Sequence, residues 1–384
     1  MNAKRLAVGI LLVVLASRAC TLAMAQSLDE QRCAAPSVTM SQDDGLDGWC
    51  RPSCNDPCPA VYGQVEELFM KREHRVRQQR IVIDGRNPNP TLMSTSDLDF
   101  DFDTGMRATV GMRLCEGRAL EFSYFGLSQG TATATAVSTG GEYLTLPGNV
   151  GGNVFLAMKR TQVNYSSWVN SFEVNLPCCC GCCDRCRDDS ACAEVRDDCS
   201  SREVCDDSGC GTVRCRSFEW FAGFRYLNLG EEFNLLGQRT EGGGVVEGTY
   251  NVRTANHLYG GQLGARVRRW QDRFGWEATG KAGIFANDAQ QTQSVQDYLR
   301  VIRPTVSSSS GGVAFVGEIN LSALYRLTDV WNLRAGYNVM WIEGLALAPD
   351  QLDFNFATAS SGNQLHNGGG LLLHGVNIGL EARW

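Results

Sequence analysis

The feature that most constrains the fold of this chain is an alternation of apolar and polar residues, repeated in segment after segment. The last fourteen residues, LLLHGVNIGLEARW, show it clearly: every second residue from Leu372 to Trp384 is mostly apolar, and those between are small, polar or charged. Because successive side chains of a strand point to opposite faces, this segment is predicted to be a strand with one apolar face. We expect its end to be held in a sheet, since an unpaired terminus usually frays.

Ten segments are predicted to be strands, and many have the 9–11 residues that a tilted strand needs to cross a bilayer. They are residues 61–72, 105–114, 120–126, 168–176, 217–226, 257–270, 274–284, 313–326, 330–344 and 371–384. Nine show the alternation, whereas the faces of the first, residues 61–72, are ambiguous. After the N-terminal segment, no stretch offers the roughly 18 consecutive apolar residues of a membrane-spanning helix. The pattern therefore predicts an all-β fold whose apolar strand faces contact either lipid or a protein core.

The connections between these segments alternate in length. Long links are expected at 74–97, 129–159, 230–250, 288–311 and 346–369, and short turns at 116–118, 271–272 and 328–329. Large aromatic residues stand beside the short turns, namely Trp270, Phe274, Tyr325 and Trp331. This layout is typical of a transmembrane antiparallel up-and-down β-barrel of about ten strands, in the range of eight to twelve. A soluble β-sandwich is the alternative, but it gives no reason for the alternating link lengths.

The first 25 residues have the composition of a secretory signal peptide. Lys4 and Arg5 precede a short apolar run, and Ala23-Met24-Ala25 provides a cleavage site after Ala25. Lipid attachment at Cys20 is an alternative, disfavoured by the charge of Arg18. We expect residues 26–60 to form a periplasmic N-terminal arm and residues 61–384 to form the barrel in the outer membrane.

Charge excludes one class of partner. The signal carries three of the 35 basic residues and none of the 42 acidic ones, so the mature chain has 32 basic residues and a net charge of about −10. Nucleic-acid binding needs a basic face, and we therefore expect none.

Several of these segments resemble a known family. The stretches at Leu333 to Leu352 and Leu373 to Trp384 resemble the two closing motifs of an outer-membrane β-barrel porin family described from planctomycete-type bacteria, the beta-barrel porin-7 type. The hairpin GMRATVGMRL…LEFSYFGL is similar to an early hairpin of that family. The resemblance implies an outer-membrane barrel over residues 61–384 and supplies no catalytic residue. The aromatic C-terminus also resembles the signature read by the barrel assembly machinery, which we expect as a partner beside outer-membrane lipid.

A cysteine-rich stretch at residues 177–215 departs from the pattern of short turns. It holds eleven of the 17 cysteines, with nine acidic and five basic residues, and too few apolar residues to build a core. In an oxidising periplasm such cysteines form disulfides. We expect a disulfide-rich periplasmic insert that contacts other envelope proteins. The candidates are Cys33, Cys50, Cys54, Cys58, Cys115, Cys178, Cys179, Cys180, Cys182, Cys183, Cys186, Cys192, Cys199, Cys205, Cys210 and Cys215.

Two metal-binding alternatives remain, although we expect no metal and no cofactor. Cys183 and Cys186 have the C-x-x-C spacing of a zinc site, but paired histidines are missing from the stretch. Asp97, Asp99, Asp101 and Asp103 fall on one face of a predicted strand, where four carboxylates could hold a hard cation; a solvated rim is the plainer interpretation.

The polar strand faces carry charges that would face the lumen of a barrel. These are Arg107, Arg113, Glu121, Glu173, Glu219, Arg225, Arg266, Arg268, Glu277, Lys281, Glu318, Arg326, Arg334, Glu381 and Arg383. They predict a narrow porin-like channel for ions or small solutes. The alternative is a structural envelope barrel with a closed lumen filled by ion pairs. A membrane hydrolase is disfavoured: the four histidines are scattered, with His74 and His257 near outer strand ends, His366 in a long loop and His374 facing lipid, so we expect no enzyme.

Overall fold

The computed structural model describes residues 61–114, 119–141, 143–180, 203–206, 209–212, 216–356 and 361–384. The predicted signal peptide, the N-terminal arm and most of the cysteine-rich insert lie outside these residues. Helical structure in the described ranges consists of the short 3-10 turns η2 (Thr95–Asp97), η3 (Val154–Leu156) and η4 (Ala348–Gln351). None of these is long and apolar enough to cross a membrane.

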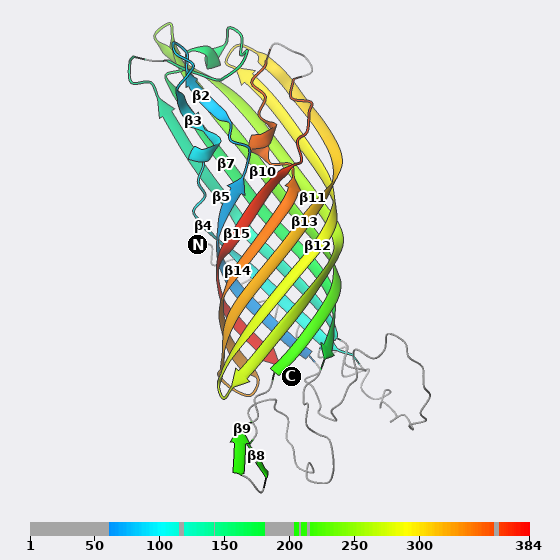
Figure 1. Ribbon diagram of the computed structural model, residues 1–384. Coiled ribbons are helices and arrows are strands. Elements are labelled where there is room, and N and C mark those ends of the chain that lie inside the picture. Colours follow the sequence, from blue (N-terminus) through cyan, green and yellow to red (C-terminus); the bar gives the residue numbers. More distant parts are fainter. Residues whose placement is uncertain are drawn as a thin grey trace. The chain divides into compact units, whose positions relative to one another are not determined.

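Ten antiparallel strands close into one barrel, which confirms the predicted fold class and strand number (Figure 1). In chain order they are β1 (Val61–Arg75), β4 (Phe102–Arg113), β5 (Ala119–Val137), β7 (Arg160–Cys180), β10 (Arg216–Glu241), β11 (Gly244–Gln271), β12 (Phe274–Asp297), β13 (Val301–Arg326), β14 (Trp331–Leu345) and β15 (Gly369–Arg383). Around the ring the order is β1-β15-β14-β13-β12-β11-β10-β7-β5-β4, and β4 pairs again with β1.

The last strand is held by the first. β15 pairs with β1 from Tyr62 opposite Arg383 to Arg75 opposite Gly370. Beyond the register, the N–H of Trp384 donates to the carbonyl of Val61 at 2.9 Å. Closure satisfies the backbone groups of both strands and leaves no sheet edge, which is what a strand in lipid requires.

The two ends of the barrel differ. At the short-turn end, β11 and β12 join through Asp272 and Arg273, and β13 and β14 join through residues 327–330. At the opposite end, which we name the loop end, residues 76–101 carry β2 (Arg80–Asp84) and β3 (Thr91–Ser94), and residues 138–159 carry β6 (Leu144–Thr145); these three strands form a small sheet. Two further strands, β8 (Glu203–Asp206) and β9 (Gly209–Thr212), form a separate hairpin.

Two of the five predicted long loops are wrong. Residues 230–250 belong to β10 and β11, which turn tightly at Gly242 and Gly243, and residues 288–311 belong mostly to β12 and β13. Both glycines have positive φ, 57° and 83°, a conformation that glycine adopts without steric cost. The strands therefore continue beyond the apolar segments with a polar outer face, and an apolar outer face alone underestimates their length. The cysteine-rich insert also starts later than predicted, because β7 continues through Cys180.

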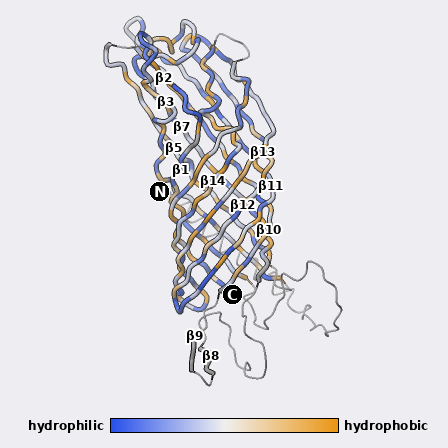
Figure 2. The backbone as a smooth tube through the Cα atoms, in the orientation of Figure 1, coloured by the Kyte–Doolittle hydropathy of each residue, from blue (hydrophilic) through white to orange (hydrophobic). Residues whose placement is uncertain are grey.

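Outward-facing residues near the short-turn end are apolar and exposed, and Figure 2 shows how hydrophobic and hydrophilic residues alternate along the strands. The exposed fractions run from 39% to 69% for Phe122, Phe172, Val174, Leu176, Phe224, Leu263, Ile284, Ile319, Leu321, Val376, Ile378 and Leu380. Aromatic rings border this belt: Phe274 and Trp331 are 66% and 44% exposed. Trp270 was predicted to be one of these bordering aromatic residues, and that prediction is wrong. Trp270 follows the inward parity of Arg268, is buried, and lies under the guanidinium of Arg326 at 4.9 Å.

Candidate functional site: the barrel interior

Strand alternation places the fifteen charged residues singled out from the sequence on the inward side of the barrel wall. Nine of them are buried to less than one-tenth exposure, namely Arg107, Glu121, Glu173, Arg225, Arg268, Glu277, Glu318, Arg334 and Glu381. The other six, Arg113, Glu219, Arg266, Lys281, Arg326 and Arg383, are partly buried. Buried charges must be paired or hydrogen-bonded, and the contacts of these residues decide what the interior can do.

Many of the ion pairs cross the lumen. Arg268 on β11 binds Glu381 on β15 at 2.8 Å, although β12, β13 and β14 separate these strands in the ring. Arg107 on β4 reaches Glu318 on β13 at 2.5 Å. Side chains from strands this far apart can meet only by extending through the interior, so these pairs occupy the lumen itself.

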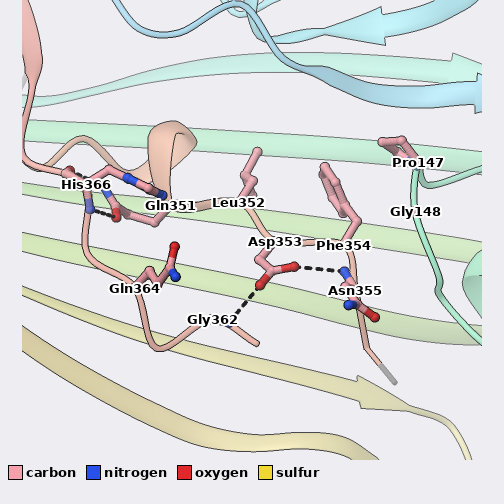
Figure 3. A pocket seen from close by; sticks show the side chains of 10 residues that line it. All are labelled: Pro147, Gly148, Gln351, Leu352, Asp353, Phe354, Asn355, Gly362, Gln364 and His366. Carbon is pink, nitrogen blue, oxygen red and sulfur yellow. Dashed lines mark hydrogen bonds between the residues drawn. The ribbon is translucent and has the colours of Figure 1, made fainter. Parts of the chain in front are cut away.

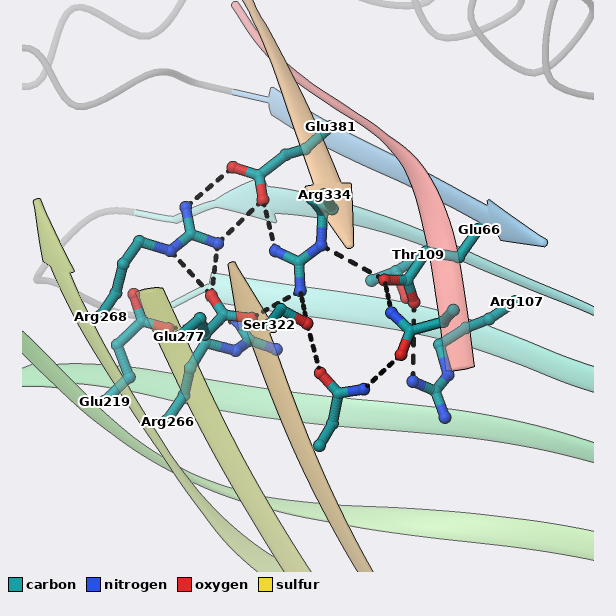
Figure 4. Close-up of polar contacts among 12 residues, drawn as sticks. Glu66, Arg107, Thr109, Glu219, Arg266, Arg268, Glu277, Ser322, Arg334 and Glu381 are labelled. Carbon is teal, nitrogen blue, oxygen red and sulfur yellow. Dashed lines mark hydrogen bonds and ion pairs between the residues drawn. The ribbon is translucent and has the colours of Figure 1, made fainter. Parts of the chain in front are cut away.

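Arg334 is the centre of this network (Figure 4). Its guanidinium contacts Glu277 and Glu381 at 2.8 Å each and Glu66 at 3.3 Å. Arg268 shares the same two carboxylates, Glu277 and Glu381. One plane of the barrel therefore holds two guanidiniums between three carboxylates from β1, β12 and β15.

A second cluster contains Glu318 and Glu173. Glu318 contacts Arg225 at 3.1 Å and Lys281 at 3.4 Å. Glu173 contacts the same two cations, at 3.4 Å and 3.0 Å. The four groups come from β7, β10, β12 and β13, so this cluster also bridges the interior.

A third cluster lies near the short-turn end. Arg266 binds Glu121 on β5 at 3.1 Å and Glu219 on β10 at 3.2 Å. Tyr62 donates to Glu121 at 2.8 Å. Arg383 contacts Glu381 at 2.6 Å and extends the central cluster in the same direction. With Glu66 on β1, every strand of the barrel contributes a charged group to one of the three clusters.

Sequence reasoning missed Glu66, which is buried to 1% exposure. Both faces of its strand are mixed, since Glu66 and Arg72 point inward while Glu67 and Lys71 point outward. The available signal was the register of neighbouring strands: Glu66 lies opposite Arg107 of β4, a residue already expected inside.

An apolar layer follows the ion pairs toward the loop end. It joins inward side chains of nine wall strands with one residue, Leu347, of the segment after β14. Its members are Leu68, Met70, Phe125, Val169, Leu227, Leu229, Leu258, Phe285, Ala314, Val316, Met340, Ile342, Leu345, Leu347, Leu371 and Leu373. Close-packed apolar side chains exclude water, so this layer separates the ionic clusters from the loop end.

Residues 346–356, which we name the plug, fold into the barrel at the loop end instead of extending from it. They include η4, and Ala346, Leu347 and Ala348 are completely buried. Leu352 and Phe354 join a second apolar cluster with residues of the other long loops, including Phe100, Leu144 and Phe155. The loops and the plug therefore form a common core over the loop end.

Inward side chains of the wall bind the backbone of the plug. The amide of Asn256 donates to the carbonyl of Ala346 and accepts from its N–H, at 2.9 and 2.8 Å. Gln293 donates to the carbonyl of Gln351 at 2.7 Å, and Arg303 donates to that of Asp353 at 3.2 Å. These bonds satisfy the polar groups that an irregular segment carries into a buried site.

Hydrogen bonds also join the plug to the segment that follows it (Figure 3). The carboxylate of Asp353 accepts from the N–H groups of Asn355 and Gly362, both at 2.9 Å. The amide of Gln351 donates to the carbonyl of His366 and accepts from its N–H. A cavity of about 450 Å³ lies beside these residues, bordered by Pro147 of the neighbouring loop.

A buried ion pair stands against the plug. Arg72 on β1 and Glu231 on β10 are 4% and 0% exposed, and Arg72 also donates to the hydroxyl of Tyr165 at 2.8 Å. The second oxygen of Glu231 accepts from the N–H of Ala348 at 2.7 Å. Neither charge was singled out from the sequence. Arg72 belongs to the first predicted strand, whose two faces are mixed, and Glu231 lies beyond the alternating segment 217–226.

The family described as "Putative beta barrel porin-7 (BBP7)" matches residues 73–384. The chain belongs to this family. The resemblance of its closing motifs and early hairpin is thereby confirmed, and with it an outer-membrane barrel. No curated protein matches the sequence.

Solved structures similar to this porin-7 barrel are other outer-membrane barrels. The outer membrane protease OmpT from Escherichia coli has 10% identity and a TM-score of 0.42, covering 87% of this chain and 99% of its own. A Pseudomonas aeruginosa FadL homologue has 8% identity and a TM-score of 0.24, covering 88% and 97%. The P. putida toluene transporter TodX has 8% identity and a TM-score of 0.25, covering 86% and 91%. Scores this low carry no argument about activity.

The four aspartates considered as a cation site in this porin-7 barrel have separate partners. Asp97 accepts from the N–H of Ser94 at 2.6 Å in the turn η2, and Asp99 pairs with Lys71 at 3.2 Å. Asp101 is exposed and Asp103 half-buried. Among the described residues, no group of three or more His, Cys, Asp or Glu side chains could hold a metal ion.

The described histidines do not converge. On the outer surface, Nδ1 of His257 forms hydrogen bonds with the hydroxyl of Tyr226 at 2.9 Å and with the amide nitrogen of Asn228 at 3.0 Å. His374 bonds Tyr337 there at 2.7 Å, while His366 belongs to the segment that follows the plug. The side chain of His74 lies outside the description.

The cysteine predictions fall largely outside the described residues. The structure describes the backbone of Cys178, Cys179 and Cys180 at the end of β7, and of Cys205 and Cys210 in β8 and β9. The remaining candidates are not covered. Disulfide formation therefore stays a prediction from the sequence.

Proposed function

We propose that this member of the porin-7 family is a structural barrel of the outer membrane with a closed lumen. In this role the barrel anchors the cysteine-rich insert, through which it contacts other envelope components. The observation that carries the proposal is that three successive layers occupy the lumen: the ionic clusters, the apolar layer and the plug.

Energetics favour a lumen that stays closed. Removing one partner of a buried ion pair costs about 3–5 kcal/mol, because the other charge is left without compensation. A conducting path would have to separate several cross-lumen pairs, such as Arg268 with Glu381 and Arg107 with Glu318. Barrels of about eight strands are just filled by their side chains, whereas wide aqueous channels have roughly 16–18 strands.

A second candidate is a narrow channel for ions or small solutes. The family's description as porins favours it, and so does the way in which the plug is held. Hydrogen bonds from wall side chains such as Asn256 and Gln293 hold the plug, and such bonds can be exchanged for bonds to water. In this candidate the inward charges tune the passage of ions. Neither candidate involves catalysis, in keeping with a porin family.

Conductance decides between the two. The full chain would be refolded in detergent, its folding verified by heat-modifiable electrophoresis, and the same sample inserted into planar bilayers. The structural proposal predicts no single-channel steps from folded protein. Clear steps from the wild type would overturn it and support the channel.

Charge reversal supplies the matched test for the channel. If steps occur, Arg268→Glu and Arg334→Glu would shift the ion selectivity toward cations, since both side chains lie in the lumen. Arg253→Glu is the control, because that guanidinium is exposed on the outer wall and pairs with Glu232. Unchanged selectivity in both interior variants would place the conducting path elsewhere.

A further inference from the structure

The β11–β12 hairpin carries two arginines that the interior network does not use. In the segment RVRRWQDRFGW, Arg266 and Arg268 point inward and are ion-paired. Arg269 has the opposite parity and points outward, and Arg273 lies exposed in the turn. Within the described residues neither Arg269 nor Arg273 makes an ion pair, whereas Arg253 higher on the same strand is paired with Glu232 at 2.8 Å.

Exposed aromatic residues neighbour these two arginines in the strand register and in the chain. Arg269 lies directly opposite Trp276 in the register of β11 and β12, and Trp276 is 46% exposed. Phe274, next to Arg273, packs against Tyr325 with ring centroids 4.9 Å apart. Such aromatic residues sit at the level of the headgroups where a barrel meets the edge of a bilayer. The arginines therefore lie at the depth of the lipid phosphates, on the short-turn side of an apolar belt that begins at Val267.

We propose that Arg269 and Arg273 bind the phosphate of an anionic phospholipid headgroup in the leaflet at the short-turn end. A guanidinium presents its donors as a planar fork that matches two phosphate oxygens, and its weak hydration suits an interface. Anionic lipids attract basic residues placed at the membrane surface. Asp272 lies between the two arginines in the sequence, and its negative charge opposes the binding of an anionic lipid. Removing this charge should therefore increase lipid binding.

The experiment measures lipid retention by the full chain. Wild type would be refolded in a neutral detergent, exposed to phosphatidylglycerol or phosphatidylcholine, and examined by native mass spectrometry. Wild type is expected to retain phosphatidylglycerol in preference to phosphatidylcholine. R269Q/R273Q should retain at least threefold less phosphatidylglycerol, R253Q should retain as much as wild type, and D272N should retain more.

Three outcomes would overturn the proposal. The first is equal retention of phosphatidylglycerol by wild type and R269Q/R273Q. The second is full displacement of the lipid by soluble glycerol phosphate at equal concentration, which would indicate a site for free phosphate. In the third, the wild type retains phosphatidylglycerol and phosphatidylcholine equally, and the double variant unfolds at a lower temperature in lipid-free detergent. The guanidiniums would then bind acidic residues of the same chain. Heat-modifiable electrophoresis of every variant confirms that the compared samples are folded.

Discussion

The carboxylate of Glu231 on β10 accepts a hydrogen bond from the backbone N–H of Ala348 at 2.7 Å, so a buried charge of the wall holds the plug. The same carboxylate is paired with Arg72 on the other side of the barrel. Its two oxygens thus join β1, β10 and the first residue of η4. A negative charge at this position also suits the start of a helical turn, where backbone N–H groups have no partner within the turn.

Replacing Glu231 by Gln is expected to loosen the plug. The substitution keeps the shape of the side chain but leaves the Arg72 guanidinium buried without a counter-charge. The N–H of Ala348 should exchange with deuterium at least tenfold faster than in the wild type. Glu232→Gln is the matched control, since that neighbouring side chain points outward to an exposed arginine. Equal exchange in the wild type and the Glu231 variant would mean that packing alone holds the plug.

Arg334→Met is expected to destabilise the barrel by about 3–5 kcal/mol, because three buried carboxylates would lose their shared cation. Denaturant unfolding in micelles, followed by heat-modifiable electrophoresis, measures the difference. Arg253→Met on the outer wall should change stability by less than about 0.5 kcal/mol. Adding Glu381→Gln to the Arg334 variant should recover part of the loss. A fully stable Arg334 variant would show that water can replace the guanidinium.

Plug stability should depend on pH through Asp350. Burial raises the pKa of this carboxyl above its ordinary 3.8, although the N–H of Arg77 donates to it at 2.8 Å. A raised pKa in the folded state means that protonation stabilises the docked plug. The contribution is complete below the ordinary value and is lost as the pH rises through the raised one. The thermal midpoint of wild type relative to Asp350→Asn should therefore fall across this window. A constant difference would contradict the assignment.

Glu67→Leu is expected to stabilise the barrel in a bilayer. This side chain points outward from β1, opposite Met106 and Ile378 within the apolar belt. A carboxylate on the lipid face costs less than the roughly 2–4 kcal/mol of a cation at the midplane, and we expect a gain of about 1 kcal/mol. Unfolding in lipid vesicles measures it, with Glu67→Gln as the uncharged polar control. A loss of stability in the Leu variant would indicate that Glu67 has a partner in the membrane.

The register of β8 and β9 places Cys205 opposite Cys210. Directly opposed residues of an antiparallel pair are close enough for a disulfide, and an oxidising compartment would form it. Peptide mapping without reduction is expected to recover a cross-linked fragment containing both residues. Detection of both as free thiols in protein isolated from the envelope would remove this pair from the insert's cross-links.

The sequence by itself determined the strands of the barrel wall and which of their charged side chains point inward. Period-two alternation assigned ten strands, and the charges from Arg107 to Glu381 were placed inside because a strand has only two faces. It also placed the aromatic residues Phe274 and Trp331 at the edge of the apolar belt. The periodic signal was lost where both faces of a strand are mixed, as at Glu66 and Glu67. It was also lost beyond residue 230, where the apolar residues change from the outer face to the inner face, as at Phe233 and Leu235.

Only the tertiary structure decided what fills the lumen. Arg268 meets Glu381 because closure of the ring brings β11 and β15 to face each other, and this depends on strand number and register over more than a hundred residues. The plug was likewise invisible in the sequence, since a loop that enters a barrel and one that extends into water have similar compositions. Inward side chains such as Asn256 and Glu231 make the difference, because they satisfy the backbone of the plug, and their spatial convergence is not encoded in any local pattern.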